Sequence, residues 1–169
     1  MFLDRDGTMI VDKEYIGHPD HVELLPGAAH GLKLLAQKKF LLIVVSNQSG
    51  VGRGYFSQKD VENVHHRIQQ LLAAQGVKIE RFYYCPHRPE ENCCCRKPSA
   101  ELVLAAAKFF DIDLTRSFFV GDKDLDVQTG LAAGCKTVLI NSGQYEIDKS
   151  VKPNFICKNL FEAAEWIIK

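Results

Sequence analysis

Short runs of apolar residues alternate along this chain with longer segments in which apolar residues recur every three or four positions. A continuous apolar run rich in β-branched and aromatic residues is typical of a strand that is buried on both faces of a sheet. Such runs predict strands at 1–3, 40–45, 82–84, 118–120 and 137–140.

The segments with helical spacing predict helices between and after these strands. Apolar residues recur at that spacing after Ser57, a plausible N-cap, and Asn159 with Glu162 three residues later resembles a capping box. Two further helices are predicted, one following 26–27 and running to 37, the other covering 99–110. The alternation of strands and helices predicts an α/β fold, a doubly wound parallel sheet with helices on both faces.

The composition is that of one ordinary globular domain, which we expect to span residues 1–169. Hydrophobic residues make up 46% of the chain and charged residues 25%, a mixture that excludes extensive disorder. Lysine plus arginine and aspartate plus glutamate both number 21, so the zero net charge gives no reason to expect a nucleic acid or membrane partner. No apolar run reaches the roughly 18 residues of a membrane span, and no signal peptide is evident, so we expect a cytoplasmic protein, and a monomer.

Polar residues that could carry chemistry follow four of the predicted strands. Asp4 and Asp6 follow the first, Ser46 the second and Asp122 the fourth, while Lys97 ends the loop after the third. Ligands of open parallel sheets bind beyond the carboxyl ends of the strands, so the fold would bring these side chains together. Crowded carboxylates repel one another and usually need a cation, and oxygen ligands suit Mg²⁺. A lysine and a hydroxyl beside such a site favour phosphoryl transfer.

The segments around these residues resemble, in chain order, the four motifs of the haloacid dehalogenase superfamily of phosphatases. The segments are 4–8 (DRDGT), 46–48 (SNQ), 96–98 (RKP) and 121–126 (GDKDLD). The resemblance implies a Rossmann-like phosphatase that forms an aspartyl-phosphate intermediate.

The same resemblance implies roles for individual residues. Asp4 would be the nucleophile, and Asp6 would protonate the leaving oxygen and then activate water. Ser46 and Lys97 would hold the transferring phosphoryl group. A catalytic Mg²⁺ would be held by Asp4, by the backbone carbonyl of Asp6 and by Asp122. The last acid of the fourth motif, Asp126, is expected to support the site rather than bind the metal.

A second group of metal-binding residue types lies between the third predicted strand and the RKP segment. Cys85 and His87 are followed by three consecutive cysteines at 93–95. Three thiolates and one imidazole would complete a tetrahedral Zn²⁺ site, and a closed site of this kind is structural. The resembled family has a Cys-x-Cys pair directly before Arg-Lys-Pro, which implies Cys93 and Cys95 as ligands and leaves Cys94 as a free thiol. We call residues 85–95 the zinc loop.

The zinc loop narrows the resemblance to phosphatases of D-glycero-D-manno-heptose 1,7-bisphosphate and of histidinol phosphate. The segments 12–15 (DKEY) and 47–54 (NQSGVGRG) are more similar to the heptose group. The resemblance therefore implies a small phosphorylated metabolite as substrate and removal of the 7-phosphate of the heptose bisphosphate, with histidinol phosphate as the alternative. Guanidinium groups match phosphate oxygens, so two arginines are candidates for the second phosphate. The predicted substrate contacts, these arginines included, are Asn47, Gln48, Ser49, Arg53, Arg96 and Lys123.

The spacing of the motifs leaves little room for a cap domain. About forty residues separate Asp4 from Ser46 and about fifty separate Ser46 from Lys97, and predicted helices, strands and the zinc loop fill both intervals. We therefore expect a capless enzyme. Two other classes stay open, a phospho-accepting receiver module and an inactive zinc-stabilised interaction domain. His65 and His66 lie among polar residues of a predicted helix, so both are expected to be solvated.

Overall fold

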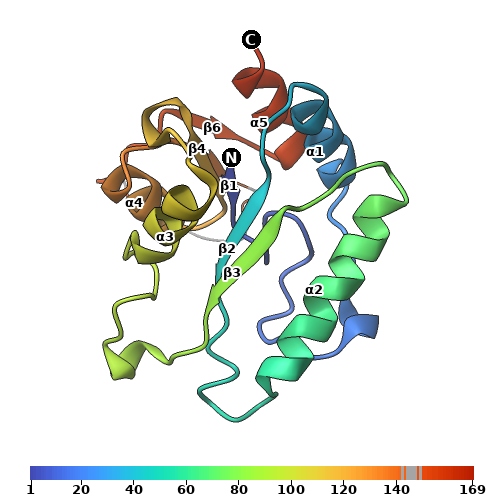
Figure 1. Cartoon of the computed structure of the whole chain (residues 1–169), viewed down its shortest axis with the longest axis vertical. Helices are drawn as coiled ribbons and strands as arrows, with labels where there is room; N and C mark the ends of the chain where they lie inside the picture. Colours follow the sequence, from blue (N-terminus) through green and yellow to red (C-terminus); the bar gives the residue numbers. More distant parts are fainter. Residues whose placement is uncertain (142, 144–147, 149) are drawn as a thin grey trace.

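The sheet is parallel throughout, as the sequence predicts. In the computed structural model, which describes residues 1–141, 143, 148 and 150–169, six strands are ordered β3-β2-β1-β4-β5-β6 (Figure 1). The order runs outward from β1 in both directions, which makes the sheet doubly wound. The strands are β1 Phe2–Leu3, β2 Ile43–Asn47, β3 Arg81–Cys85, β4 Phe118–Gly121, β5 Lys136–Ile140 and β6 Phe155–Cys157.

Two strands differ from the prediction. β2 begins at Ile43 rather than at 40, and it runs through Ser46 and Asn47, so the second motif lies at the end of the strand and not after it. β6 was not predicted, because its three residues are too few to form a recognisable apolar run.

Helices cover both faces of the sheet, as predicted. Apolar residues of α1, α2 and α5 pack on one face, and residues of α3 together with the end of α4 pack on the other. α4 was not predicted, because its buried residues include Asp126, Thr129 and Gly130 and therefore show no apolar periodicity. The helices are α1 Ala28–Gln37, α2 Gln58–Ala73, α3 Glu101–Phe110, α4 Asp124–Ala132 and α5 Leu160–Ile167.

The central strands bury both of their faces. In β1, Phe2 belongs to the core beneath α3, whereas Leu3 belongs to the core beneath α1, α2 and α5. β2 divides in the same way, with Val44 on the Leu3 side. Successive side chains of a strand point to opposite faces, so a strand with helices on both sides must be apolar at every position. This requirement explains the unbroken apolar runs in the sequence.

The predicted N-caps of α2 and α5 are confirmed, but one histidine was misjudged. Ser57 forms a capping box with Asp60, and the Asn159 side chain accepts a hydrogen bond from the Glu162 amide. The expectation that His65 is solvated is wrong. Its ring stacks on Phe82 of β3 with a centroid distance of 4.5 Å and is buried.

The motifs are separated only by elements of the basic fold, which confirms the capless architecture. Between β1 and β2 the structure contains a 3₁₀ turn at Pro19–His21 and α1, and between β2 and β3 it contains α2. Across the described residues, none of the helices is long and apolar enough to cross a membrane.

Candidate active site

The carboxyl ends of β1 and β4 bring two aspartates together. The strands are neighbours, and the Asp4 amide donates to the Val120 carbonyl at 2.9 Å, so Asp4 and Asp122 leave the sheet side by side. Gly7 follows in a left-handed conformation with φ of 78°, and a Cβ at this position would collide with the Asp122 carboxylate. Glycine is therefore needed both for the turn and for the close approach.

Lys97 joins the first and fourth motifs. Its Nζ donates to Asp4 Oδ1 at 2.7 Å, to Asp126 Oδ1 at 2.6 Å and to the Val45 carbonyl at 3.1 Å, and its side chain is only 4% exposed. Burial acts to lower the pKa of Lys97, but the carboxylates of Asp126 and Asp4 outweigh it and raise the pKa. Burial raises the pKa of Asp4, and the attraction of Lys97 opposes that shift. The lysine is therefore a buried cation between two acids.

Asp122 has a buried carboxylate oxygen that could bind a cation. Burial, reinforced by the negative charges of Asp4 and Asp126, raises its pKa to about 8. Its Oδ1 accepts a hydrogen bond from Thr8 at 3.3 Å, whereas its buried Oδ2 has no hydrogen-bond partner among the described residues. A divalent cation would satisfy the oxygen and offset the repulsion, so the residues present fit Mg²⁺.

Asp126 is engaged on both of its oxygens. Oδ1 accepts from Lys97, and Oδ2 accepts from the Lys123 amide at 3.0 Å. Oxygen atoms of Asp4, Asp122 and Asp126 lie within 4.8 Å of one another, a spacing at which three acids could share an ion. Because Asp126 already has two donors, the arrangement leaves Asp4 and Asp122 as the better side-chain ligands, with Asp126 in support.

Asp6 is held away from the other acids by two residues of its own surroundings. Arg5 is fully buried and forms an ion pair with Asp6, with 2.9 Å between Arg5 Nη2 and Asp6 Oδ2. Gln48 Nε2 donates to the same Asp6 oxygen at 2.9 Å. The sequence analysis gave Arg5 no role. Its position could have predicted a buried and paired arginine, because a charged residue between two acids directly after a buried strand is not expected to be solvated.

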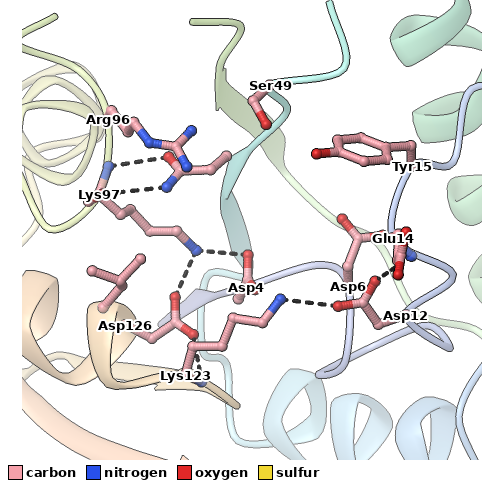
Figure 2. A pocket seen from close by; sticks show the side chains of 12 residues that line it. Asp4, Asp6, Asp12, Glu14, Tyr15, Ser49, Arg96, Lys97, Lys123 and Asp126 are labelled. Carbon is pink, nitrogen blue, oxygen red and sulfur yellow. Dashed lines mark hydrogen bonds and ion pairs between the residues drawn. The ribbon is translucent and has the colours of Figure 1, made fainter. Parts of the chain in front are cut away.

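A cavity of about 510 Å³ opens above Asp4 (Figure 2). Figure 2 shows Arg96, Lys97 and Lys123 along one side, with Tyr15 and Glu14 on the other. Lys123 Nζ reaches across to Asp12 Oδ2 at 2.9 Å. The lining residues are Asp4, Asp6, Asp12, Glu14, Tyr15, Asn47, Ser49, Arg96, Lys97, Lys123, Leu125 and Asp126.

The predicted substrate contacts divide between this cavity and its surroundings. Four of them line it. Gln48 is buried and is not among the lining residues, and Arg53 Nη2 lies 3.9 Å from Glu90 Oε1 of the zinc loop. Glu14 and Tyr15 also line the cavity, although the sequence had singled out their segment, 12–15, only for its resemblance to the heptose group. The four that line the cavity are Asn47, Ser49, Arg96 and Lys123.

Two of the lining residues also hold the backbone around Lys97. The Asn47 side chain accepts from the Lys97 amide at 3.0 Å and donates to the Lys97 carbonyl at 3.3 Å. Arg96 Nη1 donates to the His87 carbonyl at 3.1 Å. The end of β2 and the zinc loop therefore both determine where the Lys97 segment lies.

The zinc loop gathers the four predicted ligands. Cys85 Sγ lies 3.4 Å from Cys93 Sγ, and His87 Nδ1 lies 3.5 Å from the sulfurs of both Cys85 and Cys95. Against the effect of burial, hydrogen bonds from Cys85 and Cys95 lower the pKa of Cys93 to about 7, whereas burial raises the pKa of Cys85. Three sulfurs and one nitrogen at these spacings fit a tetrahedral Zn²⁺ site. Cys94 is exposed and lies outside the group.

Known proteins are similar to this chain in both sequence and fold. The family model described as HAD-hydrolase-like matches residues 94–163. The D-glycero-β-D-manno-heptose-1,7-bisphosphate 7-phosphatase of Helicobacter pylori strain J99 is 40% identical over 99% of this chain and 95% of its own length. The protein of the same name from Escherichia coli K12 is 36% identical over 99% of this chain and 87% of its own length.

A solved structure is similar over nearly the whole length. It is the D,D-heptose 1,7-bisphosphate phosphatase from B. bronchiseptica, complexed with magnesium and phosphate, and it matches with a TM-score of 0.89 and 29% identity over 99% of this chain and 97% of that chain. Membership in this family contradicts the receiver-module alternative. With its motifs gathered at one edge of the sheet, this chain belongs to the haloacid dehalogenase-like hydrolases, as a phosphatase of the family that contains these heptose-bisphosphate phosphatases.

Proposed function

We propose that this protein is a Mg²⁺-dependent phosphatase that removes the 7-phosphate of D-glycero-D-manno-heptose 1,7-bisphosphate. The observation that carries the proposal is the convergence of Asp4, Lys97 and Asp122. Asp4 and Lys97 are joined by an ion pair and line one cavity, and an oxygen of Asp122 lies within 4.8 Å of an oxygen of Asp4. The names of relatives that are 35–40% identical supply the substrate.

In the first step, an oxygen of Asp4 attacks phosphorus and a P–O bond forms as the bond to the sugar oxygen breaks. The leaving oxygen takes a proton from Asp6, so a neutral alcohol departs. Lys97 and the Ser46 hydroxyl hold the phosphoryl oxygens, and the short Lys97–Asp4 contact keeps the nucleophile oriented. A bound Mg²⁺, held by Asp4, Asp122 and the Asp6 backbone carbonyl, would neutralise the carboxylates and the phosphate.

In the second step, water hydrolyses the aspartyl-phosphate. Asp6 is then the base, because it lost its proton to the alcohol, and it takes a proton from the attacking water. The bond between phosphorus and the Asp4 oxygen breaks, inorganic phosphate leaves, and the Asp4 carboxylate is regenerated. Each proton that Asp6 gives in the first step is thus returned in the second.

The cavity offers cations for a second phosphate. Arg96 and Lys123 line it on the side of Lys97, and Ser49 adds a hydroxyl. Arg53 lies outside this lining, so its predicted contact would require the loop at 51–56 to move toward the substrate. We propose that the second phosphate rests on Arg96 and Lys123, with Asn47 positioning the Lys97 segment next to it.

We also propose that Cys85, His87, Cys93 and Cys95 hold a structural Zn²⁺. Four protein ligands leave no open position for a substrate. The ion would secure a loop that is tied to the catalytic segment through the Arg96–His87 hydrogen bond. For this chain we keep the expectation of one domain and of a cytoplasmic monomer, and its molecular mass in solution, measured by light scattering, checks the oligomeric state.

Comparing two substrates tests the proposed specificity. We expect kcat/KM for phosphate release from the heptose bisphosphate to exceed that for histidinol phosphate by about 100-fold or more, because the second phosphate gains charge-assisted contacts. Position-specific detection of the product would show a free 7-hydroxyl and a retained 1-phosphate. Equal or faster release from histidinol phosphate would contradict the assignment.

The variant Arg96→Gln sharpens the comparison. It should lower kcat/KM for the bisphosphate more than that for the monophosphate, which would localise the second phosphate. An equal fall for both substrates would be the effect of losing the Arg96–His87 hydrogen bond beside Lys97. Arg116→Gln is a matched control, since Arg116 lies at the opposite end of β4 and should affect neither substrate.

A further inference from the structure

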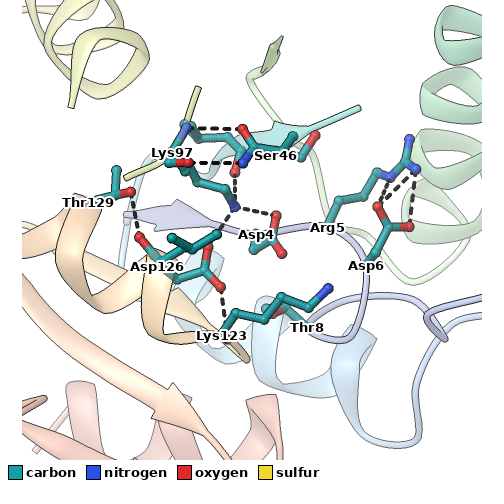
Figure 3. Close-up of polar contacts among 12 residues, drawn as sticks. Asp4, Arg5, Asp6, Thr8, Ser46, Lys97, Lys123, Asp126 and Thr129 are labelled. Atoms are coloured by element: carbon teal, nitrogen blue, oxygen red, sulfur yellow. Dashed lines mark hydrogen bonds and ion pairs between the residues drawn. The ribbon is translucent and has the colours of Figure 1, made fainter. Parts of the chain in front are cut away.

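A buried arginine lies directly beside the proposed general acid. Arg5 Nε donates to Asp6 Oδ2 at 3.0 Å and Arg5 Nη2 donates to Asp6 Oδ1 at 3.1 Å (Figure 3). Arg5 is fully buried, and a guanidinium removed from water needs a carboxylate at this distance. The ion pair that stabilises Arg5 in the core therefore also determines the orientation of the Asp6 side chain.

Gln48 completes this arrangement from the second motif. Its Oε1 accepts from Arg5 Nη2 at 2.7 Å, and its Nε2 donates to Asp6 Oδ2 at 2.9 Å and to Ser46 Oγ at 3.3 Å. Gln48 is 4% exposed and is not among the residues that line the cavity. One amide thus connects the proposed acid to the hydroxyl that holds the phosphoryl group.

We propose that Arg5 and Gln48 are positioning residues that hold the Asp6 carboxyl for proton transfer to the leaving oxygen. The inference rests on the proposed function, in which Asp6 is the acid. Oδ2 accepts from both positioning residues, whereas Oδ1 accepts one described hydrogen bond, from Arg5. Since a carboxylate oxygen has two lone pairs, Oδ1 keeps one for the proton. That proton passes to the alcohol as the P–O bond breaks, and a proton from water replaces it.

Such a role makes a prediction about leaving groups. An alkyl alcohol is a poor leaving group and needs a proton from Asp6, whereas p-nitrophenolate departs without one. The phosphoryl group is the same in both substrates, so a defect that acts through Ser46 would slow both equally. The parameter kcat/KM includes the steps up to the departure of the alcohol, so it isolates the step in which the acid acts.

The experiment compares Gln48→Leu with the wild type on the heptose bisphosphate and on p-nitrophenyl phosphate. We expect kcat/KM to fall about tenfold or more for the sugar phosphate and less than threefold for the aryl phosphate. Arg5→Lys, which keeps the charge and loses the planar fork, should show the same selectivity. Gln48→Leu keeps the test valid if Arg5→Lys does not fold, as judged by circular dichroism.

Three further variants separate the possible causes. Gln69→Leu removes an amide that also makes two hydrogen bonds, because its Oε1 accepts from Ile79 N and its Nε2 donates to Val77 O just before β3. This variant should lower stability without changing the ratio of kcat/KM between the two substrates. Ser46→Ala should slow both substrates equally. Asp6→Asn should show the strongest selectivity for the sugar phosphate.

The outcomes distinguish the two levels of the proposal. One outcome is that Asp6→Asn lowers kcat/KM selectively for the sugar phosphate while Gln48→Leu lowers it equally for both substrates. That result would overturn the positioning role and leave Asp6 as the acid. Equal loss on both substrates in Asp6→Asn would overturn Asp6 as the acid and the positioning role with it. Selective loss in both variants supports both.

Discussion

The carboxylate site and the zinc loop are connected through Arg96 and Lys97, yet different forces hold them. In the carboxylate site, Lys97 and Asp126 are 4% and 1% exposed and joined at 2.6 Å, and Asp4 is anchored to the end of a central strand. In the zinc loop, Cys93 and Cys95 are only half-buried and contact each other at 3.7 Å between their sulfurs. The first site is organised by the sheet, whereas the second is a set of donors that face a common point.

Because the two sites are held differently, a metal ion would have a different role in each of them. At the carboxylate site, a cation would relieve repulsion among acids that the fold has already brought together. In the zinc loop, the metal would supply the bonds that hold the loop in shape, because binding and local folding are coupled. Removing metal should therefore affect activity in the first case and structure in the second.

The largest effect is expected from Asp4→Asn. Turnover should fall by about 10⁴-fold or more, because an amide cannot form the acyl-phosphate bond. Phosphate release under multiple-turnover conditions measures it. The fold should persist, since Lys97 keeps its contact with Asp126, and thermal unfolding checks this. Residual activity above a few per cent of the wild type would remove Asp4 as the nucleophile.

Next in size is the loss of the buried cation in Lys97→Met. This variant should lower the free energy of unfolding by about 3–5 kcal/mol, since it leaves Asp4 and Asp126 as unpaired buried acids. Urea unfolding measures the change. Adding Asp126→Asn should restore part of the loss. A change below about 1 kcal/mol would show that the ion pairs do not organise this site.

A smaller effect is expected from removing zinc. Metal-free protein should melt about 5–10 °C lower than the zinc-bound form, and amide hydrogen exchange should speed up in the zinc loop but not in β1 or β4. Cys93→Ser should reproduce the change, and Cys94→Ser is the matched control that should not. Identical melting of the two forms would contradict a structural zinc.

The smallest effect is a pH dependence of stability from His65, a buried residue of α2 that is near enough to Arg5 to be affected by its charge. Burial lowers the pKa of His65 to about 3, while the unfolded chain takes up a proton below about 6.5. Stability from this residue is therefore complete above pH 6.5 and is lost as pH falls, by about 1 kcal/mol between pH 7 and 5.5.

His65→Phe should remove this part of the pH slope in denaturant unfolding, because phenylalanine can stack on Phe82 without titrating. The exposed neighbour offers a control, and His66→Phe should keep the slope. If both variants keep it, His65 is not held neutral in the folded protein.

Much of the fold and of the carboxylate site could be predicted from the sequence. Buried parallel strands require apolar residues at every position, so their runs are visible without a structure. Asp4, Lys97 and Asp122 were predicted to meet because parallel strands end at a common edge, and they do. Elements with weak patterns were missed, namely α4, whose buried face is partly polar, and β6, which has three residues.

Spacing and residue type determined the sheet and its edge of polar residues, and the resemblance to a known family then singled out the four donors of the zinc loop. The tertiary structure decided which of those polar residues face the cavity and which hold them in place. Gln48 follows Ser46 by two residues and could face a substrate, yet it is buried against Arg5 and Asp6. The physical reason is that a buried charge must find its partner across the chain, and the sequence does not show which donors and acceptors come within 3 Å of one another.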